Sequence, residues 1–420
     1  MKYKHKLLID HKIGGFVCGV LSLAARPARK LFRRDHSLRK APRTVLFLKF
    51  VGLGSVCRSS FLIRACKMKY PESRIAFACF PECATLVGLY GQIDDLLVIR
   101  DKGLLELCLD TVKALVWCWS HRVDLVIDLE VHSKYSSIFA ASTLSRDRAG
   151  FCYISSRFRR DLYTHLVYWN PLRHTDESYK QLAQALDMDG SSSTLIPKVP
   201  VYDQEKTQQL LDECGVTKSD RIVCVNVNAG PLSLERRWPA GSFAKTLSSI
   251  PKHKGIHIFL LGTLPEKKYV DSVLTLLSPE RSAFNMHNIA GRLTLPMLVD
   301  LLKRSFLLLT NDSGPMHLAE LLKTPTVSLW GPTAPALYGS PSENHKAFYQ
   351  PLYCSPCVHI TDSPPCAGDN QCLKRLPWQP VAREILSRLG YADTSLSPEA
   401  APEKEKKFVA GYWDIRAKTD

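Results

Sequence analysis

The residues best suited to chemistry lie between Phe306 and Gly331, in the run FLLLTNDSGPMHLAELLKTPTVSLWG. An apolar strand ends at Thr310, a polar turn follows, and a helix begins at Pro315, a position that tolerates a missing N–H. The amides of a first helical turn, together with the positive end of the helix dipole, bind anions the size of a phosphate. The run therefore predicts a phosphate site at the start of this helix.

Four residues of this turn are candidate ligand contacts. Asp312 and Ser313 can cap the helix or accept hydrogen bonds from the hydroxyls of a ribose or another sugar. Gly314 lets a ligand approach the backbone, and His317, one turn into the helix, can donate to a phosphate oxygen. Turns of this composition are common, so a merely capped turn with a packed histidine is the alternative, and for an isolated turn the favoured one.

Alternating strands and helices must position these residues. Apolar strands and helices alternate from Thr44–Phe50 to Val123–Asp128, pause at the proline-containing connector Leu195–Pro200, and resume from Ile222–Asn226 to Thr326–Trp330. This pattern predicts an α/β protein with two Rossmann-like, doubly wound domains facing across a cleft, with ligands bound at the strand carboxyl ends. The expected division is a basic arm over 1–42, a first domain over 43–195, a second domain over 196–392 and a disordered tail over 393–420.

The amino-terminal arm carries more than half of the excess positive charge. The chain has a net charge of +16, and residues 1–42 hold eleven Lys and Arg against Asp10 and Asp35, a net of +9. Within the arm, Ile13–Ala25 is uncharged but shorter than the ~20 residues that span a bilayer. We expect an anchor on an acidic membrane surface, with a solvated extension as the alternative. The net charge is the only feature that favours a nucleic-acid partner. The sequence contains no known nucleic-acid-binding module, so no nucleic-acid partner is expected.

At Asn311–Ala319 and Pro325–Thr333 the sequence resembles glycosyltransferase family 9, the ADP-heptose:lipopolysaccharide heptosyltransferase family. The family's N/D-D-S/T-G-P-x-H-x-A and P-T-V-x-L-x-G-P-T segments match these two stretches. The resemblance extends from about Thr44 to Leu389 and is more specific in the second domain. Three further blocks agree in order, namely Asn226–Pro239, Phe259–Glu266 and Asn288–Leu295.

The resemblance implies a GT-B fold and an enzyme of lipopolysaccharide biosynthesis. The cysteine usage and the basic arm add the expectation of a cytoplasmic protein, peripheral on the inner face of the membrane. Its donor would be a nucleotide-diphosphate sugar, and its acceptor a lipopolysaccharide or another glycan or lipid-linked molecule. Transfer of the heptose-like sugar would be inverting and metal-independent, with no cofactor required. Arg236 matches the basic residue that neutralises the donor diphosphate, and Asp312, Ser313, Gly314 and His317 match the donor turn. Glu266 matches the acid that holds ribose hydroxyls, although a plain helix-start glutamate is the alternative.

The first domain departs from the family at one position. Lys49–Ser55, KFVGLGS, stands where the family has G-x-x-G-D, with Gly52 and Gly54 opening the helix start to an anionic ligand. Ser55 replaces the family's aspartate, the proposed general base, and a serine needs an activating partner to act as one. Glu130 and His132, after the strand Val123–Asp128, are the surrogate candidates, although His132 is more often a packed or surface residue. The alternative function is a catalytically impaired sugar-nucleotide-binding protein.

The fourteen cysteines divide into two groups. Ten are scattered through predicted strands and helices as small apolar residues, Cys108 among them, which indicates a reducing cytoplasm. The other four lie within the loop 354–372. One C-x2-C with two further cysteines can form a tetrahedral zinc knuckle, and reduced thiols in an irregular loop are the alternative, favoured because the second pair lacks zinc-ribbon spacing. These four are Cys354, Cys357, Cys366 and Cys372.

Overall fold

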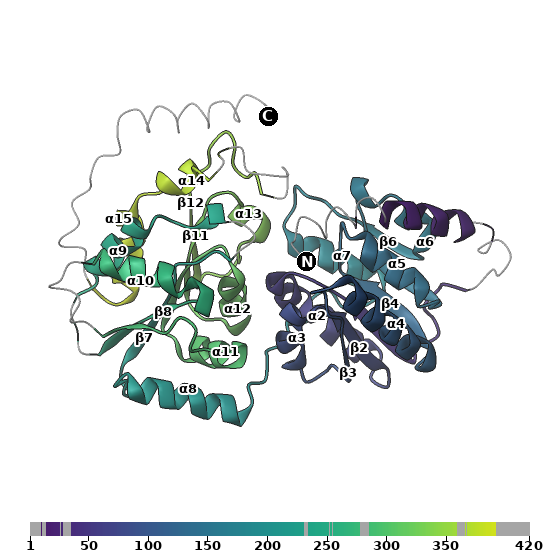
Figure 1. Ribbon diagram of the computed structural model, residues 1–420, viewed down its shortest axis with the longest axis horizontal. Coiled ribbons are helices and arrows are strands. Elements are labelled where there is room, and N and C mark those ends of the chain that lie inside the picture. Colours follow the sequence, from purple (N-terminus) through teal and green to yellow (C-terminus); the bar gives the residue numbers. More distant parts are fainter. Residues whose placement is uncertain are drawn as a thin grey trace. The chain divides into compact units, whose positions relative to one another are not determined.

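The chain divides into two compact units, Met1–Pro200 and Val201–Asp420, each built on one parallel sheet (Figure 1). The computed structural model describes residues 10, 14–25, 27, 35–230, 234–251, 253, 255–277, 285–358, 366 and 368–391. Part of the predicted basic arm, the predicted tail and part of the Cys-rich loop therefore lie outside the described residues.

The sheet of the first unit has six strands in the order β3-β2-β1-β4-β5-β6. Its central strand, TVLFL, is buried along its whole length, because helices cover both faces of a parallel sheet. The order reverses between β1 and β4, so the loops that follow these two strands meet at one point of the sheet edge. The strands are β1 (Thr44–Leu48), β2 (Arg74–Cys79), β3 (Asp95–Val98), β4 (Val123–Asp128), β5 (Asp147–Cys152) and β6 (His165–Tyr168).

Right-handed crossovers assign the helices of this unit to two layers. The helices before the reversal, α2 and α3, cover one face, and those after it, α4 and α5, cover the other. α7 packs on α2. Residues 14–25 form a further helix whose Leu21 and Ala25 pack on the same core cluster as α4 and α5. The helices are α2 (Leu53–Lys69), α3 (Pro81–Gly88), α4 (Leu104–Ser120), α5 (Lys134–Ser142), η1 (Ile154–Ser156), α6 (Arg159–Leu162) and α7 (Thr175–Ala185).

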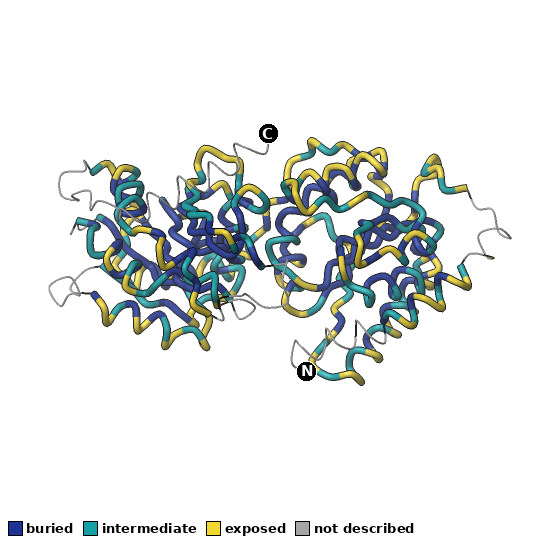
Figure 2. The backbone as a smooth tube through the Cα atoms, turned by 90° about the horizontal axis from the view of Figure 1, so that it is seen from above, coloured by how far each residue is buried: buried dark blue, intermediate teal, exposed yellow. Residues whose placement is uncertain are grey.

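The second unit repeats this plan with the sheet order β12-β11-β10-β7-β8-β9. Its order reverses between β7 and β10, and both strands are buried. In each unit the buried backbone is concentrated in the sheet, and exposed residues lie on the outer sides of the helices (Figure 2). The strands are β7 (Arg221–Asn226), β8 (Ile256–Leu261), β9 (Met286–Asn288), β10 (Leu307–Asn311), β11 (Thr326–Trp330) and β12 (His345–Tyr349).

Eight α-helices and two short 3-10 helices among the described residues flank this second sheet. The last long helix, α15, buries Val381 and Ile385 in the same core as β7 and β10, so it is part of the unit's core. The helices are α8 (Val201–Glu213), η2 (Leu234–Arg236), α9 (Ala240–Ser249), η3 (Leu264–Glu266), α10 (Lys267–Thr275), α11 (Leu295–Arg304), α12 (Gly314–Leu322), α13 (Pro335–Tyr338), α14 (Gln371–Lys374) and α15 (Trp378–Arg388).

The two predicted Rossmann-like sheets are confirmed, and the strand Val123–Asp128 has the predicted bounds. Sequence reasoning missed β5 and β6, since β5, DRAGFC, opens with two charges and carries a glycine. That glycine is required by close packing, because a Cβ on Gly150 would lie 2.9 Å from the Tyr163 ring. No helix of the described residues is both long and apolar enough to cross a bilayer.

Candidate functional site

The loops after β7 and β10 are fastened together by one buried side chain. The amide nitrogen of Asn311 donates to the carbonyls of Val227, at 3.0 Å, and Asn228, at 3.2 Å. Its oxygen accepts from the backbone N–H of Trp238 at 3.0 Å. Asn311 therefore fixes the β7 loop and the segment leading to Trp238 against the end of β10, at the point where doubly wound sheets bind ligands.

Two residues singled out in the sequence, Arg236 and His317, lie around the carboxylate of a third, Asp312. Asp312 is buried, and its Oδ2 lies 3.4 Å from Nη1 of Arg236 and accepts from the Thr333 hydroxyl at 2.6 Å. Its Oδ1 lies 3.9 Å from Nε2 of His317. The carboxylate thus binds the guanidinium beside the start of α12, and the imidazole lies nearby, with Nδ1 3.7 Å from Glu320. Sequence reasoning missed Thr333, although it lies in a quoted motif.

The start of α12 has no side-chain cap. Ser313 is the N-cap residue, but its hydroxyl makes no bond to the helix amides, so the capping interpretation of Ser313 is wrong. The hydroxyl instead accepts from the side-chain amide of Asn226 at 2.8 Å and donates to the carbonyl of Asn311 at 3.1 Å. The first turn holds no acidic residue, and Gly314 begins it. This helix start has the character of an anion site.

Arg236 lies on η2, a short segment with two anchors. The side-chain amide of Asn370 donates to the carbonyls of Glu235, at 2.7 Å, and Arg237, at 2.8 Å. The indole N–H of the buried Trp238 donates to the Leu376 carbonyl at 3.1 Å. Within the described residues, the buried Nε of Arg236 has no hydrogen-bond partner, so the guanidinium retains donor capacity for an anion.

Glu266 belongs to a capping box and does not contact Asp312. Its Oε2 accepts from the backbone N–H and the hydroxyl of Thr263, both at 2.8 Å, at the start of η3. Its Oε1 lies 3.9 Å from Arg237, whose guanidinium lies over the Tyr269 ring at 4.2 Å. Glu266 therefore caps a helix start in this structure, and its contact with a ribose stays a prediction.

In the first unit, the loop after β1 uses both predicted glycines at a helix start. Gly52 has φ of 95°, a conformation that favours glycine, and is the N-cap residue of α2; Gly54 lies in the first turn. That turn holds no acidic residue, and no side chain caps it. Ser55, partly buried in the same turn, hydrogen-bonds the buried hydroxyl of Tyr179.

Glu130 acts as a clamp on this loop. One carboxylate oxygen accepts from the backbone N–H of Phe50, at 2.9 Å, and of Val51, at 3.3 Å, while the other lies 2.9 Å from Nζ of Lys49. Burial lowers the pKa of Lys49, but the attraction of Glu130 outweighs it and leaves that pKa raised. A carboxylate that already accepts three hydrogen bonds is poorly placed to take a proton from a substrate.

His132 is the accessible one of the two surrogate bases. Its side chain is exposed, Nδ1 lies 2.8 Å from the Ser155 hydroxyl, and the ring contacts Tyr153 edge-on with centroids 5.5 Å apart. A hydroxyl partner on one ring nitrogen orients an imidazole, as a general base requires.

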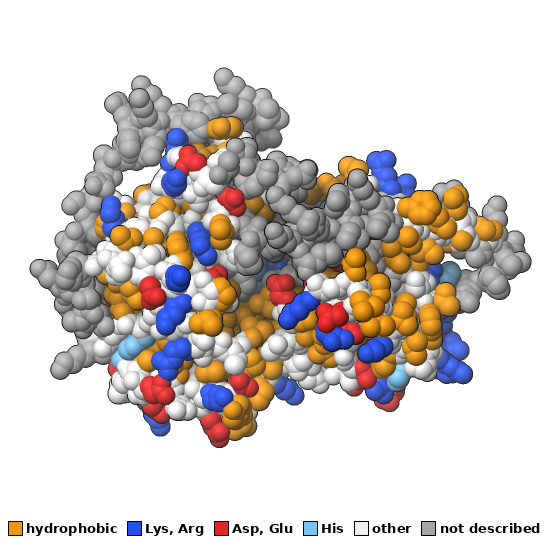
Figure 3. Space-filling model, viewed as in Figure 1, with side chains coloured by type: hydrophobic (Ala, Val, Ile, Leu, Met, Phe, Trp, Pro, Cys, Tyr) orange, Lys and Arg blue, Asp and Glu red, His pale blue; other side chains and the backbone are white. Residues whose placement is uncertain are grey.

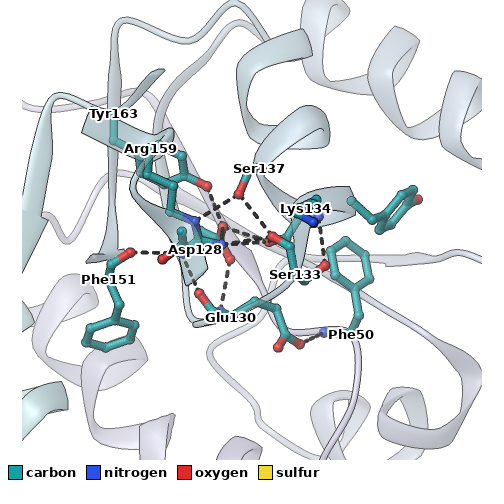
Figure 4. Close-up of polar contacts among 12 residues, drawn as sticks. Phe50, Asp128, Glu130, Ser133, Lys134, Ser137, Phe151, Arg159 and Tyr163 are labelled. Carbon is teal, nitrogen blue, oxygen red and sulfur yellow. Dashed lines mark hydrogen bonds and ion pairs between the residues drawn. The ribbon is translucent and has the colours of Figure 1, made fainter. Parts of the chain in front are cut away.

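A buried ion pair holds the loop that carries Glu130 and His132 (Figure 4). Arg159 is fully buried, and its guanidinium lies 2.9 Å from Asp128 and donates to the Glu130 carbonyl at 2.6 Å. Burial raises the pKa of Asp128, against the attraction of Arg159. Sequence reasoning missed Arg159, since an arginine within RFRRDL carries no mark of burial. Its further partners are the Ser133 and Phe151 carbonyls and the Ser136 and Ser137 hydroxyls.

No cluster of three or more His, Cys, Asp or Glu suited to a metal ion occurs in the part of the chain that the structure describes. In the Cys-rich loop, burial first and neighbouring thiols second raise the pKa of Cys357. Elsewhere, burial raises the pKa of Cys66 and Cys118 to about 12, as expected for packed thiols. Cys108 differs, because it is exposed on α4 and not part of the core.

Two parallel six-stranded sheets whose strand order each reverses once, as in the solved heptosyltransferase structures, define a GT-B glycosyltransferase fold. Residues 119–367 match Glycosyltransferase family 9 (heptosyltransferase), and the chain belongs to this family.

Among its relatives, the lipopolysaccharide heptosyltransferase 2 of Salmonella typhimurium is 30% identical over 154 residues, 36% of this chain and 42% of the relative. The lipooligosaccharide heptosyltransferase 2 of Haemophilus ducreyi is 35% identical over 184 residues, 40% and 51% respectively. The chain thus spans about half the length of these relatives. Among solved structures, Escherichia coli ADP-heptose lipopolysaccharide heptosyltransferase II shares the fold with a TM-score of 0.66 at 19% identity, covering 82% of this chain and 98% of that one.

Proposed function

We propose that the chain transfers a heptose-like sugar from a nucleotide-diphosphate sugar to a lipopolysaccharide or another glycan or lipid-linked acceptor. The observation that carries the proposal is the convergence of Arg236 and His317 on Asp312, beside the uncapped start of α12. Membership in glycosyltransferase family 9 supports it, and the names of its relatives supply the sugar and acceptor class.

The donor diphosphate would bind at the start of α12. The Arg236 guanidinium and the first-turn amides would stabilise the charge that develops on the leaving diphosphate, and His317 would donate to one of its oxygens. Fixed cations and amides of this kind support a metal-independent transfer. The acceptor hydroxyl would attack the anomeric carbon from the opposite side, so the configuration would invert.

The acceptor hydroxyl needs a base, and His132 is our choice. It is exposed and oriented through Ser155, whereas Glu130 is engaged by Lys49 and two backbone amides. Ser55 occupies the family's aspartate position and lies against Tyr179, so it would position the acceptor.

Alanine at Arg236 and at His317, in separate variants, tests the donor site. We expect about tenfold weaker ADP binding by calorimetry and about a hundredfold loss of transfer for Arg236→Ala, because one charge-assisted contact to the leaving group is lost. Arg304→Ala is the matched control, since Arg304 lies at the end of α11, away from α12's start, and contacts Asp300 on α11 at 2.8 Å and Gln208 on α8 at 2.6 Å. Unchanged binding and transfer in Arg236→Ala would refute the assignment.

A second candidate is a sugar-nucleotide-binding protein without turnover. The absence of a carboxylate at Ser55, with Glu130 used as a clamp, favours it. Two results together would establish this alternative. The wild-type protein would bind ADP-sugars but form no product over a panel of acceptors, and a Ser55→Asp variant would gain transfer activity.

We also propose a peripheral location at the inner face of the membrane, with the basic arm bound to acidic lipid. The net charge of +9 over residues 1–42 supports this partner.

A further inference from the structure

Helix α4 of the first unit carries an exposed apolar stripe. Five large side chains recur at intervals of four and three residues and so share one side of the helix. Each is between 49% and 73% exposed. They are Leu105, Leu109, Val112, Val116 and Trp119.

The stripe is separate from the side of α4 that faces the core. Asp110, Ala114 and Cys118 are buried, and Ala114 and Cys118 belong to the core cluster of the unit. The helix is therefore already anchored without the stripe, which leaves the stripe as surplus apolar surface. Contiguous surfaces of this type mark contact with a partner or a membrane.

The helix over residues 14–25 extends this surface. Phe16, Val20 and Leu23 again lie at four- and three-residue spacing and are exposed, Phe16 to 75%. The other side of the helix is fixed to α5 and α6 through Cys18, 3.8 Å from the Lys134 carbonyl, and Ser22, 3.2 Å from the Phe158 carbonyl. Apolar side chains gather over this helix and over α4 on the same side of the unit (Figure 3).

The exposed charge around the stripe is mainly positive. Between residues 102 and 122 the charged residues classed as exposed are Lys102, Lys113 and Arg122. The two acids of α4 pair with Arg100: Asp110 is buried, 2.8 Å from Nε of Arg100, and Glu106, whose side chain is 43% exposed, lies 3.9 Å from Nη1. In the sequence, residues 26–34 after the first helix add five Lys and Arg and no acid. The surface thus combines leucine, valine and tryptophan with cations, as an interfacial membrane helix does.

We propose that this apolar face, made of the stripe on α4 and of Phe16, Val20 and Leu23, docks on a lipid bilayer that contains anionic lipid. The inference deepens the proposed membrane partner, and it does not depend on the transfer reaction. Charge argues against a second copy as the occupant. In a two-fold pair through the middle of α4, Lys113 would face Lys113 of the other copy, and the partly exposed acid of this helix, Glu106, already pairs with Arg100.

Vesicle flotation with the full chain tests the proposal. We expect wild-type protein to float with phosphatidylcholine vesicles that contain about 30% phosphatidylglycerol, and much less with phosphatidylcholine alone. Leu109→Asp/Val116→Asp should lower the partition coefficient at least about tenfold, because two charges would have to enter the interface. Lys102→Glu/Lys113→Glu should weaken binding to the anionic vesicles alone.

Val201→Asp is the matched control, because Val201 is 69% exposed at the start of α8 in the second unit. Calorimetry with ADP shows whether the donor site in the second unit works, and denaturant unfolding shows whether the substituted first unit is folded, so a failed donor site and a misfolded variant are each distinguished from a failed docking face. A fluorophore on Cys108 reports directly, since this is the exposed cysteine and it lies beside the stripe. A blue shift on adding anionic vesicles supports docking.

Two results would overturn the proposal. One is flotation of Leu109→Asp/Val116→Asp at the wild-type level. The other is a wild-type dimer that fails to float and that the same substitutions convert to a monomer, which would assign the face to a contact between copies.

Discussion

Arg236 Nη1 lies 3.4 Å from Asp312 Oδ2, although 76 residues separate them in the chain. The contact joins the loop after β7 to the turn after β10 and aims a cation at the start of α12. At 3.4 Å it is a long hydrogen bond, so the guanidinium keeps capacity for a stronger acceptor such as a phosphate oxygen.

Asn370→Ala should impair donor binding without touching the donor. The side-chain amide of Asn370 bridges the carbonyls on both sides of Arg236, and its loss would free η2 at a cost of about 1–3 kcal/mol in the free energy of unfolding. We expect the KM for the donor to rise several-fold with a smaller change in kcat. Gln371→Ala, one residue along and bonded to Asp369, is the control. An unchanged donor KM would show that Arg236 is held in place without Asn370.

Glu130→Gln separates a clamp from a base. It would leave the buried Lys49 ammonium without its charge partner, so we expect a loss of about 3–5 kcal/mol in urea unfolding. Adding Lys49→Met should recover most of this stability, because the unpaired charge is then gone. A stable Glu130→Gln protein that has lost only kcat would instead identify Glu130 as the base.

Arg159→Met should destabilise the first unit by about 3–5 kcal/mol, because it strands the Asp128 carboxylate in the core. The stability of Arg159→Lys should lie between those of Arg159→Met and the wild type, since an ammonium keeps the charge but cannot reach all partners of the planar guanidinium. Denaturant unfolding measures both. Equal stability of Arg159→Met and wild type would show that Asp128 is protonated in the folded protein.

The Arg100–Asp110 pair should make α4 sensitive to acid. Hydrogen bonds from the side chain and backbone N–H of Arg100 lower the pKa of Asp110 to about 2. A carboxyl whose folded pKa lies below its unfolded value contributes stability above the unfolded pKa and loses it as the pH falls through the folded one. Asp110→Asn should therefore be destabilising at neutral pH, with the difference vanishing as the pH approaches 2. A difference that persists at pH 2 would assign the effect to packing.

Metal analysis addresses the Cys-rich loop. We expect the chain purified under reducing conditions to contain no stoichiometric zinc, because the spacing from Cys366 to Cys372 is not that of a zinc ribbon. Thiol titration of the unfolded chain should then give all fourteen cysteines. One zinc per chain, lost in a Cys357→Ser variant together with thermal stability, would contradict this.

Much of the fold follows from local patterns. The buried strand VDLVID could be predicted from its apolar composition, and the amphipathic helix α4 from the helical spacing of its apolar residues. β6 and β9 are four and three residues long, too short to establish a period, and their place comes from pairing with the neighbouring strand. Tertiary pairing of this kind is not encoded in a window of sequence.

The candidate site was predictable where its residues lie close together in the sequence. Asp312 and His317 share one motif, so their proximity is local, whereas Asn370 reaches η2 from more than a hundred residues away. The role of Glu130 could be recognised only in the structure. In the sequence, a glutamate after a strand looks the same whether its side chain faces solvent or accepts hydrogen bonds from backbone N–H groups.

The anchors of Arg236 bear on where this chain can be cut. The stretch that matches the family ends at residue 367, short of both Asn370 and the Leu376 carbonyl that holds the Trp238 indole. A fragment excised at that boundary would keep the arginine and lose its two tethers, along with the core contribution of α15. A C-terminal half that folds on its own would therefore have to extend through Arg388. Proteolytic cleavage between residue 367 and Arg388 should abolish donor binding, although every motif that matches the family would remain intact.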